Sequence, residues 1–348
     1  MSDAVGIDGR RLEKWLAGRL PGFEGPLTVS RFEGGQSNPT FKLAAASGDY
    51  VLRKKPAGTL LPSAHAIDRE YRVLKALSGS GVPVPQVHLY CDDESITGTE
   101  FYLMEHVTGR VRHDPLLADE DRAGREAFYD SMNEALAQLH LFDWRAHGLA
   151  DFGKPTDYFA RQVSLWARQY EKAGTAEVPA MDALRTWLEA NLPEDEASSV
   201  VHGDYRIGNL IAHLTEPRVV AILDWELSTI GHPLADLAFN CMTYHLPAGH
   251  PIAPGFTGAE LGGMGIPLEG SYLEDYASRT GRDPRPIWRF CMAFSLYRTA
   301  AIQAGVYGRA QRGNAVSESA ALFGDSYRLV AEIGRRVAAG EESSWLSG

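Results

Sequence analysis

The sequence is poor in cysteine and carries an excess of negative charge. Only three cysteines occur in 348 residues, Cys91, Cys241 and Cys291, and no two of them form a C-x-x-C pair. An odd number of widely spaced cysteines argues against a disulfide framework and a cysteine-ligated zinc site, and it favours a reducing, cytoplasmic location. The 34 basic residues face 45 acidic ones, and the resulting net charge of −11 argues against a nucleic-acid-binding protein.

Long apolar runs are also missing. Nowhere do about 18 uncharged apolar residues follow one another, which is the length that a membrane-spanning helix needs. The first twenty residues carry charges throughout and lack the apolar segment of a signal peptide. We therefore expect no membrane partner. The composition, 44% hydrophobic and 23% charged, is that of a globular protein, and the length predicts two domains or lobes.

Strand signals dominate residues 1–107, and helical signals dominate residues 108–348. Short apolar runs bounded by Gly, Asn, Ser or Asp indicate strands, and apolar residues three or four apart indicate helices. The predicted strands are 27–32, 41–45, 50–53, 87–90 and 101–104, with one helix at 66–77; the later predicted helices include 128–141, 158–173, 181–191, 286–304 and 317–339, interrupted by β-rich runs at 207–212 and 219–223. These patterns predict an α+β fold with a small antiparallel β-rich lobe and a larger, mainly helical lobe.

Polar side chains follow apolar runs at two places in the second lobe. His202-x-Asp204-x-x-x-x-Asn209 has the spacing of a kinase catalytic loop, and Asp224 ends a predicted strand as the metal-binding aspartate of a kinase does. A carboxylate at position 204 would accept the proton of an attacking hydroxyl, while Asn209 and Asp224 offer the oxygen ligands that Mg²⁺ prefers. Asp and Asn are also common in turns and helix caps. The catalytic interpretation is favoured because the β-rich lobe, the 202–209 motif and Asp224 follow one another in the order that a kinase-like chain requires.

A glycine-rich turn lies between the first two predicted strands. Gly34 and Gly35, followed by Ser37 and Asn38, would let backbone N–H groups approach phosphate oxygens. The turn is not a P-loop, because Gly-Lys-Ser/Thr is absent. An ordinary Gly-Gly hairpin would explain the same residues.

The third predicted strand offers two cations. Strand alternation places Val51 and Arg53 on one face and Lys54 on the other. If Val51 covers an adenine ring, Arg53 is the phosphate contact, and Lys54 is the alternative. Glu70, on the following helix, is the expected ion-pair partner, with Asp68 or a purely solvated helix face as alternatives.

The segment after the last predicted strand of the first lobe could bind the adenine edge. This expectation concerns the exposed backbone from Glu105 to Val107 and rests on position along the chain. A plain linker between lobes would look the same.

Taken together, these features resemble the aminoglycoside phosphotransferase-like family, which shares the protein-kinase fold. The resemblance implies a nucleotide-binding lobe over residues 1–107, and a lobe over 108–348 with the catalytic loop and the acceptor site. It also implies ATP and Mg²⁺ as cofactors and a small hydroxylated acceptor. The likeness runs through the Gly34-Gly35 turn, 50–53, Glu70, 104–107, 202–209 and Asp224 to Gly231-His232-Pro233-Leu234-Ala235-Asp236-Leu237-Ala238, where His232 stands in place of a common Asp.

Within that family, the sequence is most similar to the branch related to the kinase-like domain fused to certain acyl-CoA dehydrogenases. This similarity is carried by residues 51–56, 161–162, 294–298 and 305–307. It implies a hydroxy acid or an acyl thioester as acceptor rather than an antibiotic. Glu226, Asp236 and the helices of 110–200 and 286–340 are candidate walls of the acceptor site, and Asp236 is expected to support the active-site loops.

Other readings of the chain are a protein kinase, a non-catalytic nucleotide-binding regulatory module and a hydrolase. Only about a dozen residues separate Asp224 from the next predicted helix, which leaves no room for a long activation segment. The regulatory module is disfavoured because Asp204, Asn209 and Asp224 are all present. The nucleophile motif G-x-S-x-G and the zinc motif H-E-x-x-H are absent. A homodimer is compatible with the sequence, which does not fix the oligomeric state.

Overall fold

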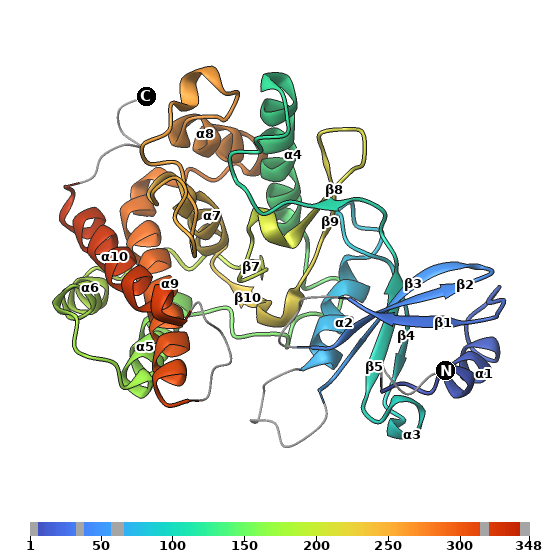
Figure 1. Ribbon diagram of the computed structural model, residues 1–348. Coiled ribbons are helices and arrows are strands. Elements are labelled where there is room, and N and C mark those ends of the chain that lie inside the picture. Colours follow the sequence, from blue (N-terminus) through green and yellow to red (C-terminus); the bar gives the residue numbers. More distant parts are fainter. Residues whose placement is uncertain (1–5, 33–37, 57–65, 314–319, 342–348) are drawn as a thin grey trace.

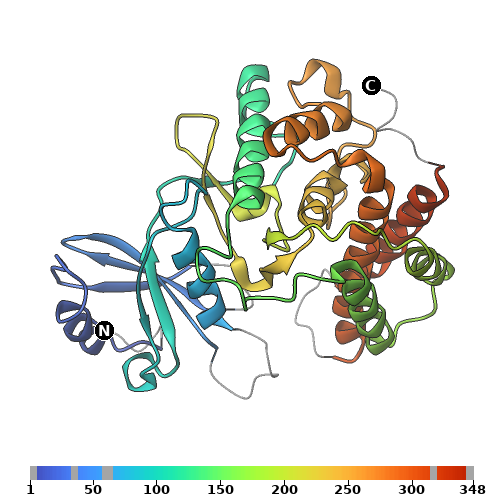
Figure 2. The same cartoon turned by 180° about the vertical axis from the view of Figure 1, so that it is seen from behind.

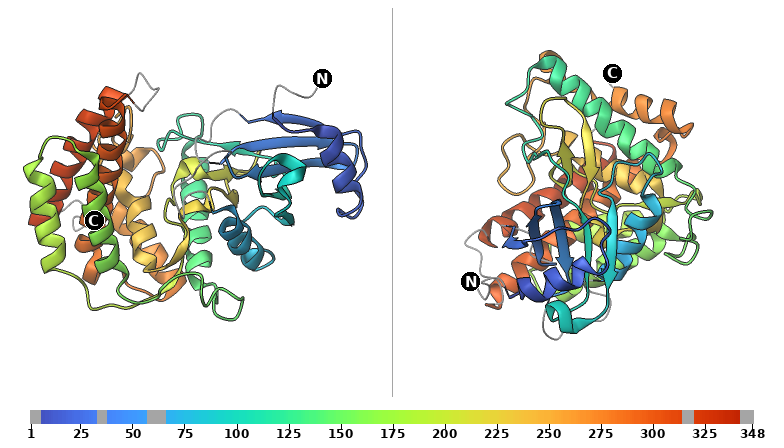
Figure 3. Two further views of the ribbon diagram at one scale, coloured as in Figure 1. Left: turned by 90° about the horizontal axis from the view of Figure 1, so that it is seen from below. Right: turned by 90° about the vertical axis from the view of Figure 1, so that its right-hand side faces the viewer.

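The α+β fold class is confirmed by a computed structural model, which describes residues 6–32, 38–56, 66–313 and 320–341. An antiparallel sheet forms one end of the molecule, and a mainly helical part forms the other (Figure 1). The two parts also lie at opposite ends when the molecule is seen from below (Figure 3). Among the described helices, none combines the length and apolar content that crossing a bilayer requires.

The sheet has the strand order β1-β2-β3-β5-β4, and every neighbouring pair is antiparallel. Alternation along β3 separates two cores: Leu52 packs with the apolar face of α1, whereas Val51 belongs to the core on the opposite face. The strands are β1 (Thr28–Arg31), β2 (Thr40–Ala45), β3 (Gly48–Lys54), β4 (Val87–Cys91) and β5 (Phe101–Glu105), and the helices beside them are α1 (Gly9–Ala17) and α3 (Glu94–Thr97).

Helix α2 (Ile67–Leu77) lies between the sheet and the helical part (Figures 1 and 2). Its apolar residues Val73 and Leu74 are buried at the spacing that the sequence predicts. The helix contacts β4 and β5 on one side and the short 3₁₀ turn Trp225–Leu227 on the other. A side chain on α2 can therefore reach both parts of the molecule.

The helical part is organised around α9 (Trp288–Gln311), which contacts four other helices and is apolar on all sides. A helix that is hydrophobic all round is buried, and here the neighbours α5, α6, α7 and α10 cover it. The helices of this part are α4 (Arg122–Leu141), α5 (Tyr158–Ala173), α6 (Pro179–Ala190), α7 (Pro233–Cys241), α8 (Glu269–Thr280), α9 and α10 (Ala320–Ala339).

Short strands carry the loops that face the sheet. β7 (Ser199–Val201) pairs with β10 (Thr229–Gly231), and β8 (Leu210–Ala212) pairs with β9 (Val219–Ile222) and with β6 (Arg110–Val111). The strand predicted at 207–212 is wrong in its first half, because Ile207–Asn209 forms a 3₁₀ turn that brings Asn209 back to Asp204. The strand begins only at Leu210.

Candidate functional site

A buried histidine anchors the loop that follows β7. The His202 Nδ1 atom accepts a hydrogen bond from the backbone N–H of Asp204 at 3.1 Å. The proton of the neutral ring is therefore on Nε2, which donates to the carbonyl of Leu223 at 2.8 Å. Since Leu223 follows β9 directly, the ring ties the loop 202–209 to the segment that presents Asp224.

The backbone of the same loop is held by two buried charges. Gly203 has φ +84°, and a Cβ atom there would lie 2.8 Å from the carbonyl oxygen of Leu227, so only glycine fits. The Arg298 guanidinium, on α9, donates to the carbonyl of Gly203. The Asp236 carboxylate, on α7, accepts from the N–H groups of His202 and of Gly203, the latter at 2.8 Å.

Asp236 is ionised although it is buried. Burial by itself opposes the charge, but His140 and the Gly203 N–H outweigh it and lower the pKa of the Asp236 carboxyl. His140 Nε2 lies 3.6 Å from the carboxylate, and its Nδ1 atom bonds to the Tyr276 hydroxyl at 2.7 Å. Asp236 holds the loop 202–209 as predicted, through the N–H groups of His202 and Gly203. It does not line the pocket described below.

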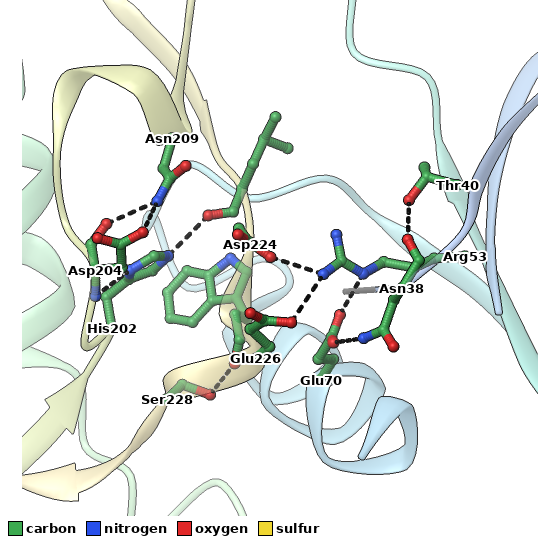
Figure 4. A network of polar contacts seen from close by, with 12 residues as sticks. Asn38, Thr40, Arg53, Glu70, His202, Asp204, Asn209, Asp224, Glu226 and Ser228 are labelled. Atoms are coloured by element: carbon green, nitrogen blue, oxygen red, sulfur yellow. Dashed lines mark hydrogen bonds and ion pairs between the residues drawn. The ribbon is translucent and has the colours of Figure 1, made fainter. Parts of the chain in front are cut away.

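Asp204 and Asn209 face each other across the loop (Figure 4). The Asn209 amide nitrogen donates to the Asp204 carboxylate at 2.7 Å and to its backbone carbonyl at 2.9 Å. The amide oxygen is therefore the Asn209 atom that is available to a cation. Arg206 Nε lies 3.4 Å from the Asp204 carboxylate. The Asp204 side chain is 23% exposed, so a reactant can reach it.

Arg53 joins the sheet to the helical part through three carboxylates (Figure 4). Its Nε atom lies 2.8 Å from Glu70 on α2, and its terminal nitrogen lies 2.7 Å from Asp224 and 3.8 Å from Glu226. Asn38 and Tyr102 donate to the two oxygens of Glu70 at 2.6 and 3.1 Å. One guanidinium thus faces three carboxyl groups, a local excess of negative charge.

Burial raises the pKa of the Glu70 carboxyl to about 7. The Arg53 guanidinium favours the ionised form, but burial together with the carboxylates of Asp224 and Glu226 outweighs it. The proton on Glu70 is therefore held more tightly in the folded protein than in the unfolded chain.

This shift makes stability depend on pH in a definite direction. A carboxyl whose pKa is higher in the folded state stabilises the fold below its unfolded value of 4.5, and that contribution is lost as the pH rises towards 7. We expect the free energy of unfolding of the wild type, minus that of Glu70→Gln, to fall by up to about 3 kcal/mol between these pH values. Urea denaturation of both proteins in EDTA, at a series of pH values, measures this difference. A difference that is flat or rises with pH contradicts the assignment.

The predicted split of Arg53 and Lys54 onto opposite faces of β3 is confirmed. Lys54 is buried on the other face, and its Nζ atom donates to the backbone carbonyl of Thr97. Arg53 is therefore the cation on the side of Asp204 and Asp224. Val51 lies on the same face of the sheet and pairs with Met104 of β5. The predicted partner Glu70, rather than Asp68, makes the ion pair.

The other predicted nucleotide contacts are placed as follows. Asn38 is buried and orients Glu70, while Gly34, Gly35 and Ser37 lie outside the described residues. The N–H of Glu105 donates to the Gln86 carbonyl at 2.8 Å and is thus engaged within the sheet. Val107 lies in the irregular segment between β5 and β6.

The donor set fits a magnesium ion bound together with phosphates. Among the described residues, no group of three or more Asp, Glu, His or Cys side chains is arranged to hold a metal. Asn209 and Asp224 supply two oxygen ligands, which suits Mg²⁺ because it usually keeps water and substrate phosphates in its shell. Asp224 has φ +67°, a left-handed conformation that Asp and Asn tolerate better than other non-glycine residues.

A pocket of about 250 Å³ opens beside the loop 202–209, between α4, α7 and α9. Tyr129 and Met132 of α4 and Phe239 of α7 form apolar walls, and Arg206 and Ile207 of the loop form the side towards Asp204. The predicted wall residue Glu226 is not part of it and faces Arg53 instead. Two of its walls, α4 and α9, lie in the ranges 110–200 and 286–340 from which walls of the acceptor site were predicted, whereas the wall from α7 was not predicted.

Comparison with known proteins assigns these features to one family. The model of the phosphotransferase enzyme family matches residues 28–272. The chain is 46% identical over 323 residues to acyl-CoA dehydrogenase family member 10 of Mus musculus, covering 92% of this chain and 30% of that protein. The chain spans less than half the length of the curated relatives it matches. The predicted similarity to the acyl-CoA dehydrogenase branch is confirmed.

Solved structures share the fold. A crystal structure of a Ralstonia eutropha protein, described as a candidate aminoglycoside phosphotransferase, superposes with a TM-score of 0.89 at 45% identity and covers 96% of this chain and 99% of its own. Spectinomycin phosphotransferase in complex with ADP and spectinomycin superposes with a TM-score of 0.64 at 12% identity, covering 95% of this chain and 98% of its own, a likeness of fold alone. The predicted kinase-like fold is thereby confirmed.

Proposed function

Because this chain belongs to the phosphotransferase enzyme family, we propose that it transfers the γ-phosphate of MgATP to a hydroxyl group of a small molecule. The observation that carries the proposal is the convergence of Arg53, from the sheet, with Asp224 and the Asp204–Asn209 pair, from the helical part. These are the cation, the metal-binding oxygens and the proton acceptor that phosphoryl transfer requires.

Asp204 is the proposed proton acceptor for the attacking hydroxyl. Its carboxylate is partly exposed and held by Asn209, so it keeps one orientation while remaining accessible. The buried His202 and Asp236 fix the backbone on either side of it, which places the carboxylate without contacting the reactants themselves. A bound Mg²⁺, held through Asn209 and Asp224, would neutralise charge on the phosphates.

Arg53 is the proposed phosphate contact, and Lys54 supplies a matched control. Of Arg53 and Lys54, it is Arg53 that faces Asp224. Replacing Arg53 with methionine removes this positive charge, so we expect the dissociation constant of MgATP to rise about 10- to 100-fold. Lys54→Met removes an adjacent positive charge that points to Thr97, and we expect less than about a twofold change in the same constant. Isothermal titration calorimetry of both variants measures the two effects. Equal effects of the two substitutions contradict the role of Arg53.

The acceptor is proposed to be a small hydroxylated compound connected with acyl-group metabolism. The support is the similarity to acyl-CoA dehydrogenase family member 10, part of whose length this chain matches. A hydroxy acid or a hydroxyacyl thioester would fit the proposal, because the apolar walls of the pocket suit the hydrocarbon chain of such a molecule and the basic Arg206 at its edge suits a negative charge.

Release of ADP from MgATP tests the proposal directly. The panel contains aminoglycosides, amino alcohols, sugars, and hydroxy acids with their thioesters, each measured with the wild type and with Asp204→Asn. Turnover with one class of acceptor, lost in the variant, is the expected result. Binding of MgATP without turnover on the whole panel would favour a regulatory nucleotide-binding module. Failure to bind MgATP would refute the proposal.

A further inference from the structure

The pocket beside the catalytic loop has no acidic wall. The side chains that line it are apolar or neutral, apart from the basic Arg206 and the imidazole of His113, and no Asp or Glu is among the lining residues described. Both nitrogen-bearing groups converge on Gly208: a Cβ atom at that position would lie 2.6 Å from an Arg206 terminal nitrogen and 3.3 Å from His113 Nδ1. A cation in the inner part of the pocket, near α9, would find no carboxylate among the lining residues, because the Asp204 carboxylate is not one of them and lies 3.4 Å from Arg206 Nε.

One buried polar atom inside this pocket has no partner. Gln303, on α9, is only 4% exposed, and its Oε1 atom makes no hydrogen bond with the described residues. A buried amide oxygen without a donor costs free energy, so such atoms are rare in folded proteins. The neighbouring polar groups are already used: Asn240 Oδ1 accepts from the Tyr272 hydroxyl at 2.8 Å, and Thr299 Oγ1 contacts Met242 Sδ at 3.3 Å. Gln303 thus lines the pocket with a buried acceptor atom that a donor on a bound molecule would satisfy.

We infer that Gln303 selects the acceptor, which carries an apolar body, no positive charge, and a neutral hydrogen-bond donor that reaches Gln303 Oε1. The inference rests on the proposed function, because it takes this pocket as the acceptor site next to Asp204. A site built to accept a hydrogen bond discriminates strongly against an analogue that lacks the donor, since the site's own buried polar atom is then left unpaired. The absence of carboxylates among the residues that line the pocket disfavours an ammonium group placed near Gln303.

Three six-carbon alcohols separate these contributions. 1-Hexanol has no second polar group, hexane-1,6-diol adds a neutral donor, and 6-aminohexan-1-ol adds a cation on the same skeleton. For the wild type we expect kcat/KM for the diol to exceed the values for the other two alcohols by about tenfold. Gln303→Leu, of similar volume, should lower kcat/KM for the diol to the value that 1-hexanol has. Gln303→Glu should raise kcat/KM for the amino alcohol, relative to kcat/KM for the diol, by about tenfold, because the glutamate supplies a negative charge that pairs with the ammonium group.

The dissociation constant of MgATP should be the same in wild type and in both Gln303 variants, which shows that each variant is folded and that the effect lies in the acceptor pocket. A wild type that prefers the amino alcohol, or a Gln303→Leu variant that keeps the preference for the diol, overturns the inference. Absence of turnover with all three alcohols also overturns it. Turnover with another hydroxyl compound would still leave the proposed phosphotransferase activity intact.

Discussion

Asp204→Asn is expected to lower kcat about a thousandfold while leaving the dissociation constant of MgATP within about twofold of the wild type. General base catalysis by a positioned side chain contributes roughly this factor. Asparagine is isosteric with aspartate and can still accept the hydrogen bond from Asn209, so the loop keeps its shape. The substitution therefore removes the proton acceptor and little else.

Single-turnover measurement of phosphate transfer, alongside calorimetric titration of MgATP, checks both halves of this prediction. A variant that transfers phosphate at the wild-type rate would show that the hydroxyl does not need Asp204. A variant that no longer binds MgATP would place Asp204 in nucleotide binding instead. Asp130→Asn, an exposed carboxylate of α4 that pairs with Arg279, serves as the control and should change neither constant.

Asp224→Asn is expected to raise the Mg²⁺ concentration for half-maximal activity about a hundredfold. The substitution removes a charged ligand of the proposed metal site and the 2.7 Å ion pair with Arg53. It does not disturb the backbone, because Asn tolerates the left-handed conformation that Asp224 adopts. The loss should therefore appear as a change in metal dependence rather than as unfolding.

Glu226→Gln is the matched control for this experiment. Glu226 lies two residues from Asp224 and also faces Arg53, but at 3.8 Å rather than 2.7 Å. Neutralising it changes the local charge by the same amount without removing a proposed metal ligand, and we expect less than about a threefold shift in the Mg²⁺ requirement. Equal shifts in the two variants would mean that net charge, and not ligation by Asp224, determines the metal dependence.

The parts of the fold that follow from local patterns were predictable from the sequence. The alternation along β3 placed Arg53 and Lys54 on opposite faces, and the spacing of apolar residues gave α2 with Glu70 on it. Both predictions depend on neighbours within a strand or a helix, where the direction of a side chain follows from its position in the chain.

The residues of α9 could not be predicted in the same way. Arg298 and Gln303 lie in a helix that is apolar on all sides, so no periodic pattern marks one face as functional. Arg298 meets the carbonyl of Gly203, 95 residues away in the chain, and this contact joins α9 to the loop after β7, since α7 packs against both α9 and β7. The sequence does contain a weaker indication. A charged residue and an amide occur within a long apolar helix, and such side chains are rarely buried without a partner.

If MgATP binds as proposed, it competes with the ion pair between Arg53 and Asp224. The guanidinium lies 2.7 Å from an Asp224 carboxylate oxygen that the proposed metal would use, and this contact links two segments 171 residues apart. In the proposed complex, the metal would replace Arg53 at Asp224, and the phosphates would offer their oxygen atoms to the guanidinium in return. The affinity for MgATP would then be the difference between the charge interactions that the complex gains and the ion pair that it breaks.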